Sequence, residues 1–263
     1  IKRTAFSLYG FEPLVVFQLT NSGRFSKPNG TPEPIVAYRN ELWEKGKENQ
    51  PYVIATDDYC AGIIEKYSAA VRLACEAGAD AVDVKCCHGY LLNEFLSAYS
   101  REGRYGGSVE NRTAFYLGCV KAAKAALSGG AFVTSRLNAT DTFPYPYGFG
   151  VSPEGIDLTE TKMLISLLEK EGISLLNITL GNPYLIPDVN RPWRNGNENP
   201  EVGMKRIYDV TKDLQTSFEN INIVMSGLSY PAENCVDYAE KCLQEGVARL
   251  AGFGRMGFSY PEF

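Results

Sequence analysis

The most concentrated group of chemically capable side chains lies in the stretch VDVKCCHGYL, residues 82–91. It contains the only histidine of the chain, His88, with Lys85 shortly before it and Tyr90 shortly after it. An amine, an imidazole and a phenol can all donate hydrogen bonds and exchange protons. A lysine can also act as a Schiff-base nucleophile. The structural alternatives are that Lys85 extends its ammonium group to solvent and that His88 only completes a turn.

A second group of candidate residues follows two apolar runs near the end of the chain. VMSGLSY contains Gly227, and LAGFGRM contains Gly254 and Arg255. Glycine lets the backbone approach a ligand closely, and arginine can bind a phosphate through two N–H groups. One glycine-bearing loop is an ordinary way to end a strand. Two successive loops of this kind, one with an arginine, predict a phosphate site.

Apolar runs with the length of strands alternate with helical patterns along the chain. The predicted strands are 14–19, 81–86, 131–138, 175–180, 221–227 and 249–254. The predicted helices are 56–78, 108–127, 157–171, 200–215 and 231–245, and a long polar loop covers about 20–55. The first strand reads as buried because its apolar run is continuous. Strands that alternate with helices of crossover length predict parallel βα units.

Polar residues or glycines end almost every predicted strand. These residues are Gln18, Lys85, Arg136, Thr179, Gly227 and Arg255. The carboxyl ends of the strands are where a (β/α)8 barrel builds its active site. A doubly wound sheet would normally carry G-x-G-x-x-G after its first strand, and none follows 14–19. The sequence therefore predicts an α/β fold of the (β/α)8 TIM-barrel type.

Six strands are two fewer than a closed barrel needs. We expect residues 1–263 to form a single domain with the third to eighth strands of the barrel. The first two strands would then lie outside this sequence. The first residue is Ile1 rather than methionine, which fits a start inside a longer reading frame.

The composition argues against several classes of protein. The net charge is −5 and no basic cluster stands out, so nucleic acid is not an expected partner. No apolar run approaches the roughly 18 residues of a membrane span. The seven cysteines include no C-x-x-C pair, which predicts reduced thiols in a cytoplasmic protein and no metal site. Cys86 and Cys87 are expected to be packing residues.

Four segments resemble the Old Yellow Enzyme family of FMN-dependent NAD(P)H:flavin oxidoreductases and ene-reductases. AGADAVDVKCCHGYLLNEFLSAYSREGRYGGSVENR is similar to the central signature of that family. VFQLTNSGR resembles its Q-L-x-H-x-G-R element, with Asn21 in place of the histidine. SRLNATD and GFGRMGFSYPEF resemble its later strands. The likeness runs in order along nearly the whole chain and implies a single FMN-binding domain, with NADH or NADPH as reductant.

The resemblance implies cofactor roles for the residues at the strand ends. Gln18 would bond to the polar edge of the flavin, and Arg136 would stabilise the anionic reduced ring. Gly227, Gly254 and Arg255 would hold the FMN phosphate.

A structural alternative exists for Arg136, which could form an ion pair with Asp83 or Asp141 inside the barrel. Its place at a strand end favours the flavin role.

The resemblance also implies catalytic roles for Lys85, His88 and Tyr90. Relatives usually have His, and then His or Asn, at the first two positions, where they donate to a substrate carbonyl oxygen. Hydride goes to the β carbon of an activated C=C bond, as in an enone, and Tyr90 would protonate the α carbon. Lys85 keeps the donor but is a compact charge, so anionic ligands such as phenolates should bind well.

Two alternatives to an ene-reductase follow from the same residues. A class I aldolase-like barrel would use Lys85 as its Schiff-base lysine, but it would not explain Gln18 with Arg136 or the tyrosine. A catalytically impaired flavin carrier would explain the departures at Lys85 and Asn21.

The expected partners are small-molecule substrates, and a homo-oligomer is compatible with the sequence. The loop 181–200 is the candidate lid, with Tyr184 and Trp193 as the side chains that could cover a substrate.

Overall fold

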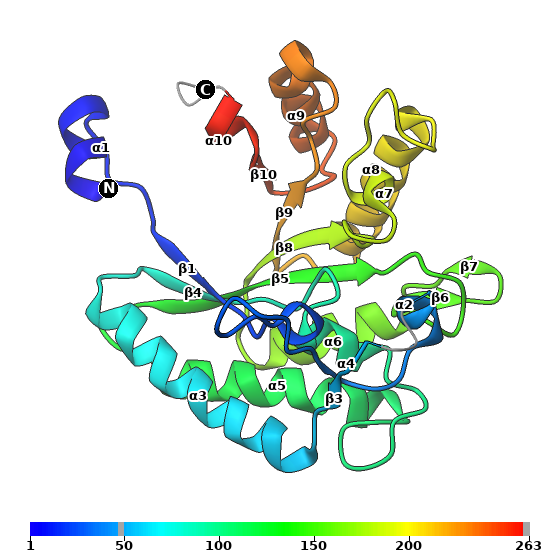
Figure 1. Cartoon of the computed structure of the whole chain (residues 1–263). Coiled ribbons are helices and arrows are strands. Elements are labelled where there is room, and N and C mark those ends of the chain that lie inside the picture. Colours follow the sequence, from blue (N-terminus) through cyan, green and yellow to red (C-terminus); the bar gives the residue numbers. More distant parts are fainter. Residues whose placement is uncertain (47–49, 260–263) are drawn as a thin grey trace.

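The structure is a computed structural model that describes residues 1–46 and 50–259. Its centre is a six-stranded sheet in which neighbouring strands are parallel and follow one another in sequence order. The strands are β1 (Val16–Leu19), β4 (Ala81–Val84), β5 (Phe132–Thr140), β8 (Leu175–Leu180), β9 (Asn222–Ser226) and β10 (Leu250–Gly252). The sheet is strongly curved from β1 to β10 (Figure 1). All six predicted strands are present within a few residues of their expected bounds.

The main helices cover the outer face of this curved sheet. They are α3 (Asp57–Glu76), α5 (Val109–Ala125), α6 (Thr159–Lys170), α8 (Pro200–Ser217) and α9 (Cys235–Gln244), the last preceded by η2 (Ala232–Asn234). Figure 1 shows α3, α5 and α6 below the sheet and α8 and α9 beyond β8 and β9. Thr56 caps α3 by accepting from the Tyr59 N–H at 3.1 Å, and Ser108 caps α5. The predicted alternation of strands and helices is confirmed.

Several short elements lie in segments that the sequence analysis left as loops. They are η1 (Gly23–Phe25), β2 (Ile35–Val36), α2 (Glu41–Glu44), β3 (Val53–Ile54), α4 (Leu91–Leu96), β6 (Val151–Ser152), β7 (Gly155–Ile156), α7 (Pro187–Asn190) and α10 (Met256–Ser259). The predicted loop of about 20–55 thus contains η1, β2, α2 and β3, and its residues 47–49 lie outside the described part. Helix α4 was missed because all six of its residues are buried, so it shows no alternation of polar and apolar faces.

The core lies between the sheet and the helices and includes buried hydroxyl groups as well as apolar side chains. Tyr116 of α5 donates to Ser135 at 2.6 Å, and Ser135 donates to the Val84 carbonyl at 2.6 Å. All seven cysteines are free, and Cys86 and Cys87 are completely buried, so both are packing residues as expected. In residues 1–46 and 50–259, no helix is long and apolar enough to cross a membrane. The same residues contain no cluster of metal-ligating side chains.

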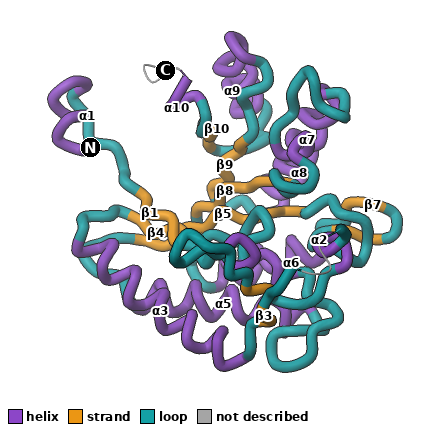
Figure 2. The backbone as a smooth tube through the Cα atoms, in the orientation of Figure 1, coloured by secondary structure: helices purple, strands orange, loops and turns teal. Residues whose placement is uncertain are grey.

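Strand β1 is an exposed edge strand, which corrects the prediction that 14–19 is buried. Val16 is 42% exposed and Phe17 is 38% exposed. The reason is that β1 pairs only with β4, and α1 (Lys2–Tyr9) beyond it buries no residue. Figure 2 shows β1 and β10 at opposite ends of the curved sheet, with α1 extending away from it. A continuous apolar run predicts burial only if other elements cover both faces and edges.

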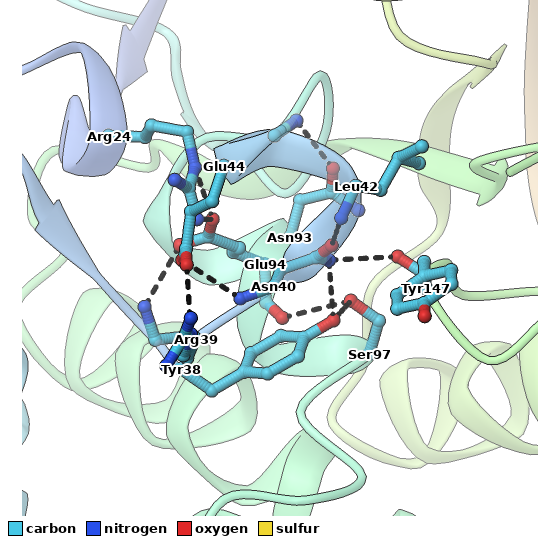
Figure 3. Close-up of polar contacts among 12 residues, drawn as sticks. Arg24, Tyr38, Arg39, Asn40, Leu42, Glu44, Asn93, Glu94, Ser97 and Tyr147 are labelled. Carbon is cyan, nitrogen blue, oxygen red and sulfur yellow. Dashed lines mark hydrogen bonds and ion pairs between the residues drawn. The ribbon is translucent and has the colours of Figure 1, made fainter. Parts of the chain in front are cut away.

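A buried ion pair fastens the segment before β2 to helix α4 (Figure 3). The Glu94 carboxylate accepts from Arg24 Nε at 2.7 Å and from the Ala37 N–H at 2.9 Å. Burial raises the pKa of Glu94, and the charge of Arg24 opposes that rise. The guanidinium also lies over the Trp43 ring, 5.2 Å from its centroid. These contacts hold η1 and α2 beside the start of α4.

A second set of hydrogen bonds extends this connection toward the loop after β5 (Figure 3). The Tyr38 hydroxyl lies 3.1 Å from Ser97 Oγ and accepts from Asn40 Nδ2 at 2.8 Å. Asn40 Nδ2 also donates to the Tyr147 carbonyl at 3.1 Å. The segment over 24–44 is therefore packed as part of the domain at the carboxyl end of the sheet.

Candidate active site

The stretch after β4 folds into a tight turn that gathers the candidate catalytic residues. His88 and Gly89 both have positive φ angles, 64° and 71°. A Cβ at Gly89 would lie 2.6 Å from Asn182 Nδ2 and 2.9 Å from the Trp43 ring, so only glycine fits there. The Gly89 N–H donates to Asn93 Oδ1 at 2.7 Å, which ties the turn to α4. The sequence HG therefore encodes the turn itself.

Pairing with the neighbouring strands places Lys85 between two other strand ends. The Lys85 N–H donates to the Leu19 carbonyl at 3.1 Å, and the Cys86 N–H donates to the Arg136 carbonyl at 2.8 Å. Gln18 near the end of β1, Lys85 just after β4 and Arg136 of β5 thus lie on adjacent strands. Because β5 continues to Thr140, the prediction that Arg136 ends its strand is wrong. Three of the residues that the sequence analysis selected are therefore brought together by strand pairing.

The Lys85 amine is buried against an aromatic ring. Its side chain is 9% exposed, and Nζ lies 3.3 Å from the centroid of the Tyr90 ring. Within the described residues it forms no ion pair, and burial lowers its pKa. The suggestion that Lys85 extends to solvent is therefore wrong. A cation over a ring face is stabilised electrostatically and still has N–H groups to donate.

His88 is a buried, neutral imidazole. It is 8% exposed, and its Nε2 lies 3.2 Å from Thr179 Oγ1 and 3.3 Å from Asn190 Nδ2. Burial lowers its pKa to about 3, and the charges of Arg136 and Lys85 act in the same direction. In the neutral ring one nitrogen carries a hydrogen and the other can accept a hydrogen bond. His88 can therefore donate one hydrogen bond without carrying charge.

Tyr90 is half-buried and keeps its proton at neutral pH. Burial raises its pKa to about 12, and the neighbouring Tyr184 hydroxyl, 3.1 Å away, adds to the rise. The Phe25 ring packs against both phenols, with centroids 5.5 Å from Tyr90 and 4.2 Å from Tyr184. A protonated phenol held in this way is suited to donate a proton.

The state of His88 predicts a pH dependence of stability. The pKa of His88 in the folded protein lies below its value in the unfolded chain, so falling pH stabilises the unfolded chain by protonating this residue there first. The stability that neutral His88 permits is complete above about pH 6.5 and is lost as the pH falls toward 3. Lowering the pH from about 7.5 to about 5 should remove roughly 2 kcal/mol of unfolding free energy through this residue. Urea unfolding of the unaltered protein and His88→Gln at both pH values measures it. Burial raises the pKa of Asp83 to about 6, so this residue makes stability rise as the pH falls. Both proteins contain Asp83, so its effect cancels in the comparison. An equal pH slope in the two proteins would contradict the prediction.

Arg136 has a hydrogen-bond donor without a partner among the described residues. It is half-buried, and its Nε has no hydrogen-bond partner in the described structure. It forms no ion pair there with Asp83 or Asp141. Gln18 Nε2 instead donates to Asp83 Oδ1 at 3.3 Å, and Asn138 Nδ2 donates to Asp141 Oδ1 at 2.5 Å. The structural alternative for Arg136 is thus not observed.

The two glycine-bearing loops lie next to each other because β9 pairs with β10. Gly227 has a φ of 91°, and a Cβ there would lie 3.1 Å from Ile207 and 3.5 Å from the Asn190 carbonyl. At Gly254 a Cβ would meet no atom within 4 Å, so the space beside it is open. Arg255 is exposed and lines a cleft of about 870 Å³. Open space, a cation and a glycine in a backbone conformation that other residues rarely adopt suit a phosphate.

The sequence analysis missed Asn190 and Arg191, which come from the candidate lid. Asn190 contacts His88, and the charge of Arg191 lowers the pKa of both His88 and Arg255. The sequence indicated Asn190 and Arg191 only indirectly, because both lie in the long loop 181–200 that follows a predicted strand. Asn21, which replaces a family histidine, donates to the Tyr59 hydroxyl at 3.1 Å and so supports η1 and α3.

Comparison with known proteins decides the family. The sequence profile of the NADH:flavin oxidoreductase / NADH oxidase family matches residues 12–263. The chain belongs to this family. The prediction of Old Yellow Enzyme membership, with a TIM-barrel fold, is confirmed. So is that of a flavin oxidoreductase family that uses FMN with NADH or NADPH.

Several characterised relatives are similar over most of this chain. It is 26% identical over 265 residues to a metal reductase of Desulforamulus reducens, covering 100% of this chain and 36% of that protein. It is 32% identical over 240 residues to an NADPH dehydrogenase of a Geobacillus species, covering 90% and 61%. It is 29% identical over 247 residues to the probable NADH-dependent flavin oxidoreductase YqiG of Bacillus subtilis, covering 87% and 61%. The chain thus spans between about a third and three fifths of these relatives.

Solved structures agree on the fold. A 2-naphthoyl-CoA reductase in complex with 2-naphthoyl-CoA superposes with a TM-score of 0.75 at 22% identity, covering 99% of this chain and 38% of that one. Morphinone reductase in complex with tetrahydroNAD superposes with a TM-score of 0.66 at 22% identity, covering 93% and 62%. Family membership favours the flavin oxidoreductase over the aldolase. The roles of the individual site residues remain predictions.

Proposed function

We propose that this protein passes hydride from NADH or NADPH, through FMN, to an activated C=C bond of an enone-type substrate. The observation that supports the proposal is that three hydrogen-bond donors lie together after the end of β4. Lys85, His88 and Tyr90 lie in one turn, with a buried amine, a neutral imidazole and a protonated phenol. Such a set suits a reaction in which negative charge develops on a carbonyl oxygen and a carbon is then protonated.

The residues present fit FMN. Arg136 has the unpartnered buried Nε, and Gln18 lies on the neighbouring strand end. Gly227, Gly254 and Arg255 would hold the phosphate, with open space beside Gly254. Bound there, FMN would supply the hydride that it takes from the nicotinamide. Arg136, which cannot readily lose its charge, would balance the negative charge of the reduced ring.

The side chains of the turn would act on the substrate in two ways. Lys85 and His88 would donate to its carbonyl oxygen, and both are held in place before the substrate arrives, His88 by Thr179. Donors that are already oriented need no reorganisation during the reaction. Tyr90 would then give its phenolic proton to the α carbon. Phenolates should bind at the same place, because the Lys85 cation has no carboxylate partner in the described residues.

The test is spectroscopic. Purified full-length protein reconstituted with FMN should be yellow, should bleach under NADH or NADPH without oxygen, and should recover its colour on addition of 2-cyclohexenone. Colour that bleaches but does not return with any enone would support the impaired carrier. Protein that retains no flavin would overturn the proposal. Trapping of a covalent adduct at Lys85 by borohydride with a carbonyl compound would support the aldolase instead.

The two edge strands of the sheet, β1 and β10, are exposed along one side. Phe17 of β1 and Leu250 of β10 are exposed apolar side chains on the two edge strands. Exposed strand edges have unpaired N–H and C=O groups that favour pairing with further strands. We propose that residues 1–263 are one FMN-binding domain and that two further strands complete its barrel. We also place the protein in the cytoplasm, because all seven cysteines are free, and a homo-oligomer is compatible with this arrangement.

A further inference from the structure

The hydroxyl groups of two tyrosines from different loops meet at the mouth of the site. Tyr90 follows β4 and Tyr184 follows β8, 94 residues later. Their oxygens are 3.1 Å apart, and either hydroxyl can donate to the other. The two residues are far apart in the chain, so the pair is a product of the tertiary structure.

Neighbouring residues hold the two phenols in contact with each other. The Phe25 ring packs against Tyr184 at 4.2 Å between centroids, tilted by 35°. Asn182 Oδ1 accepts from the Tyr184 N–H at 2.9 Å and from the Leu185 N–H at 3.3 Å. The same Asn182 side chain packs on Gly89, next to Tyr90. The hydrogen bonds of Asn182 and the packing of Phe25 therefore fix the position of Tyr184.

The two phenols differ in their access to water. Tyr90 is half-buried, with the Lys85 amine on its ring face and Phe25 beside it. Tyr184 is 52% exposed. A substrate stacked in the site would cover Tyr90 further, whereas the outer phenol would still reach solvent. The Tyr90–Tyr184 hydrogen bond is thus a direct link between the site and bulk water.

We propose that Tyr184 is a positioning residue that returns a proton to Tyr90 as Tyr90 gives its own away. The inference rests on the proposed function, in which Tyr90 protonates the substrate α carbon. The Tyr90 O–H bond breaks as the C–H bond forms, and the Tyr184 O–H bond breaks as a new Tyr90 O–H bond forms. The Tyr184 phenolate then takes a proton from water and leaves hydroxide. Charge on the inner phenol is avoided, which matters because burial disfavours it.

The kinetic test compares Tyr184→Phe with Tyr90→Phe in the full-length protein reconstituted with FMN. Phenylalanine keeps the ring packed on Phe25 and removes only the hydroxyl. Rapid mixing of NADH-reduced protein with 2-cyclohexenone should show an enone step about tenfold slower in Tyr184→Phe, since one hydrogen bond to the reacting group is lost. Reduction by NADH should be unchanged. Tyr208→Phe is the matched control, because it removes a comparable exposed hydroxyl that donates to Glu245 at 2.8 Å.

A proton inventory in mixtures of light and heavy water distinguishes a relay from structural support. Two protons in motion give the unaltered protein a curved dependence of the enone step on deuterium fraction. Tyr184→Phe should give a straight line, because one proton then moves.

A second readout needs neither flavin nor turnover. Tyrosine labelled at the ring carbon that bears the hydroxyl reports ionisation by NMR. Coupled groups titrate in shared steps, so the Tyr90 resonance should show two steps in the unaltered protein. Tyr184→Phe should leave Tyr90 with a single step.

The outcomes separate the relay from the function on which it rests. An enone step and a deuterium dependence unchanged in Tyr184→Phe, with the step slowed in Tyr90→Phe, would overturn the relay and leave the proposed function standing. A single-step titration of Tyr90 in the unaltered protein would also overturn it. An unaltered protein whose reduced flavin no enone reoxidises would overturn the function and the relay together.

Discussion

Lys85→Met is expected to slow enone reduction by roughly a hundredfold and to weaken phenolate binding. The amine is an oxyanion donor that is buried and free of any carboxylate among the described residues, so its charge is available to the ligand. Removing one preorganised donor from such a site costs about 3 kcal/mol of transition-state stabilisation. Methionine keeps the stem of the side chain. A cation beside a bound phenol also lowers the pKa of that phenol, so the variant should bind it in a less ionised form.

The measurement is rapid mixing of the two half-reactions together with a titration by a substituted phenol. Reduction by NADH is expected to slow less than the enone step. Lys121→Met is the control, because it makes the same change on the exposed face of α5. Tyr90→Phe should spare phenol binding and flavin reduction and slow only the enone step. If Lys85→Met alters neither phenolate affinity nor enone reduction, the lysine is a bystander.

Glu94→Ala is expected to destabilise the protein by about 3 to 5 kcal/mol, the usual cost of leaving the partner of a buried ion pair alone. The variant leaves the Arg24 guanidinium and the Ala37 N–H without the carboxylate to which both donate. The lost contacts tie η1 and the segment before α2 to α4, so the site should loosen as well. Equilibrium urea unfolding checks this, followed by the fluorescence of Trp43, which lies next to Arg24.

The second tryptophan, Trp193, is replaced by phenylalanine in every protein of this comparison, so that only Trp43 reports. Asp209→Ala is the matched control, because Asp209 pairs with Lys205 at 2.6 Å on the exposed face of α8. Exposed pairs contribute about 0 to 1 kcal/mol, so the control should change little. A loss in Glu94→Ala no larger than that of the control would show that burial of the pair is unimportant.

Much of the fold follows from the sequence alone because its signals are local. Strand and helix periods, the caps at Thr56 and Ser108, and the polar residues at strand ends are read within a few positions of one another. Parallel βα units can be arranged in few ways, so the active-site edge follows from the alternation. Together with the family resemblance, these local signals single out Lys85, His88 and Tyr90 as candidate catalytic residues.

Other features depended on residues that are far apart in the chain. The Tyr90–Tyr184 contact spans 94 residues and the His88–Asn190 contact spans 102, and no periodic pattern encodes either. Burial of α4 and exposure of β1 depended in the same way on which elements cover them. Desolvation, which sets the pKa of His88 and of Lys85, exists only once those layers are packed. The sequence determined which groups are present at the strand ends, and the tertiary packing decided their charge, their partners and their access to water.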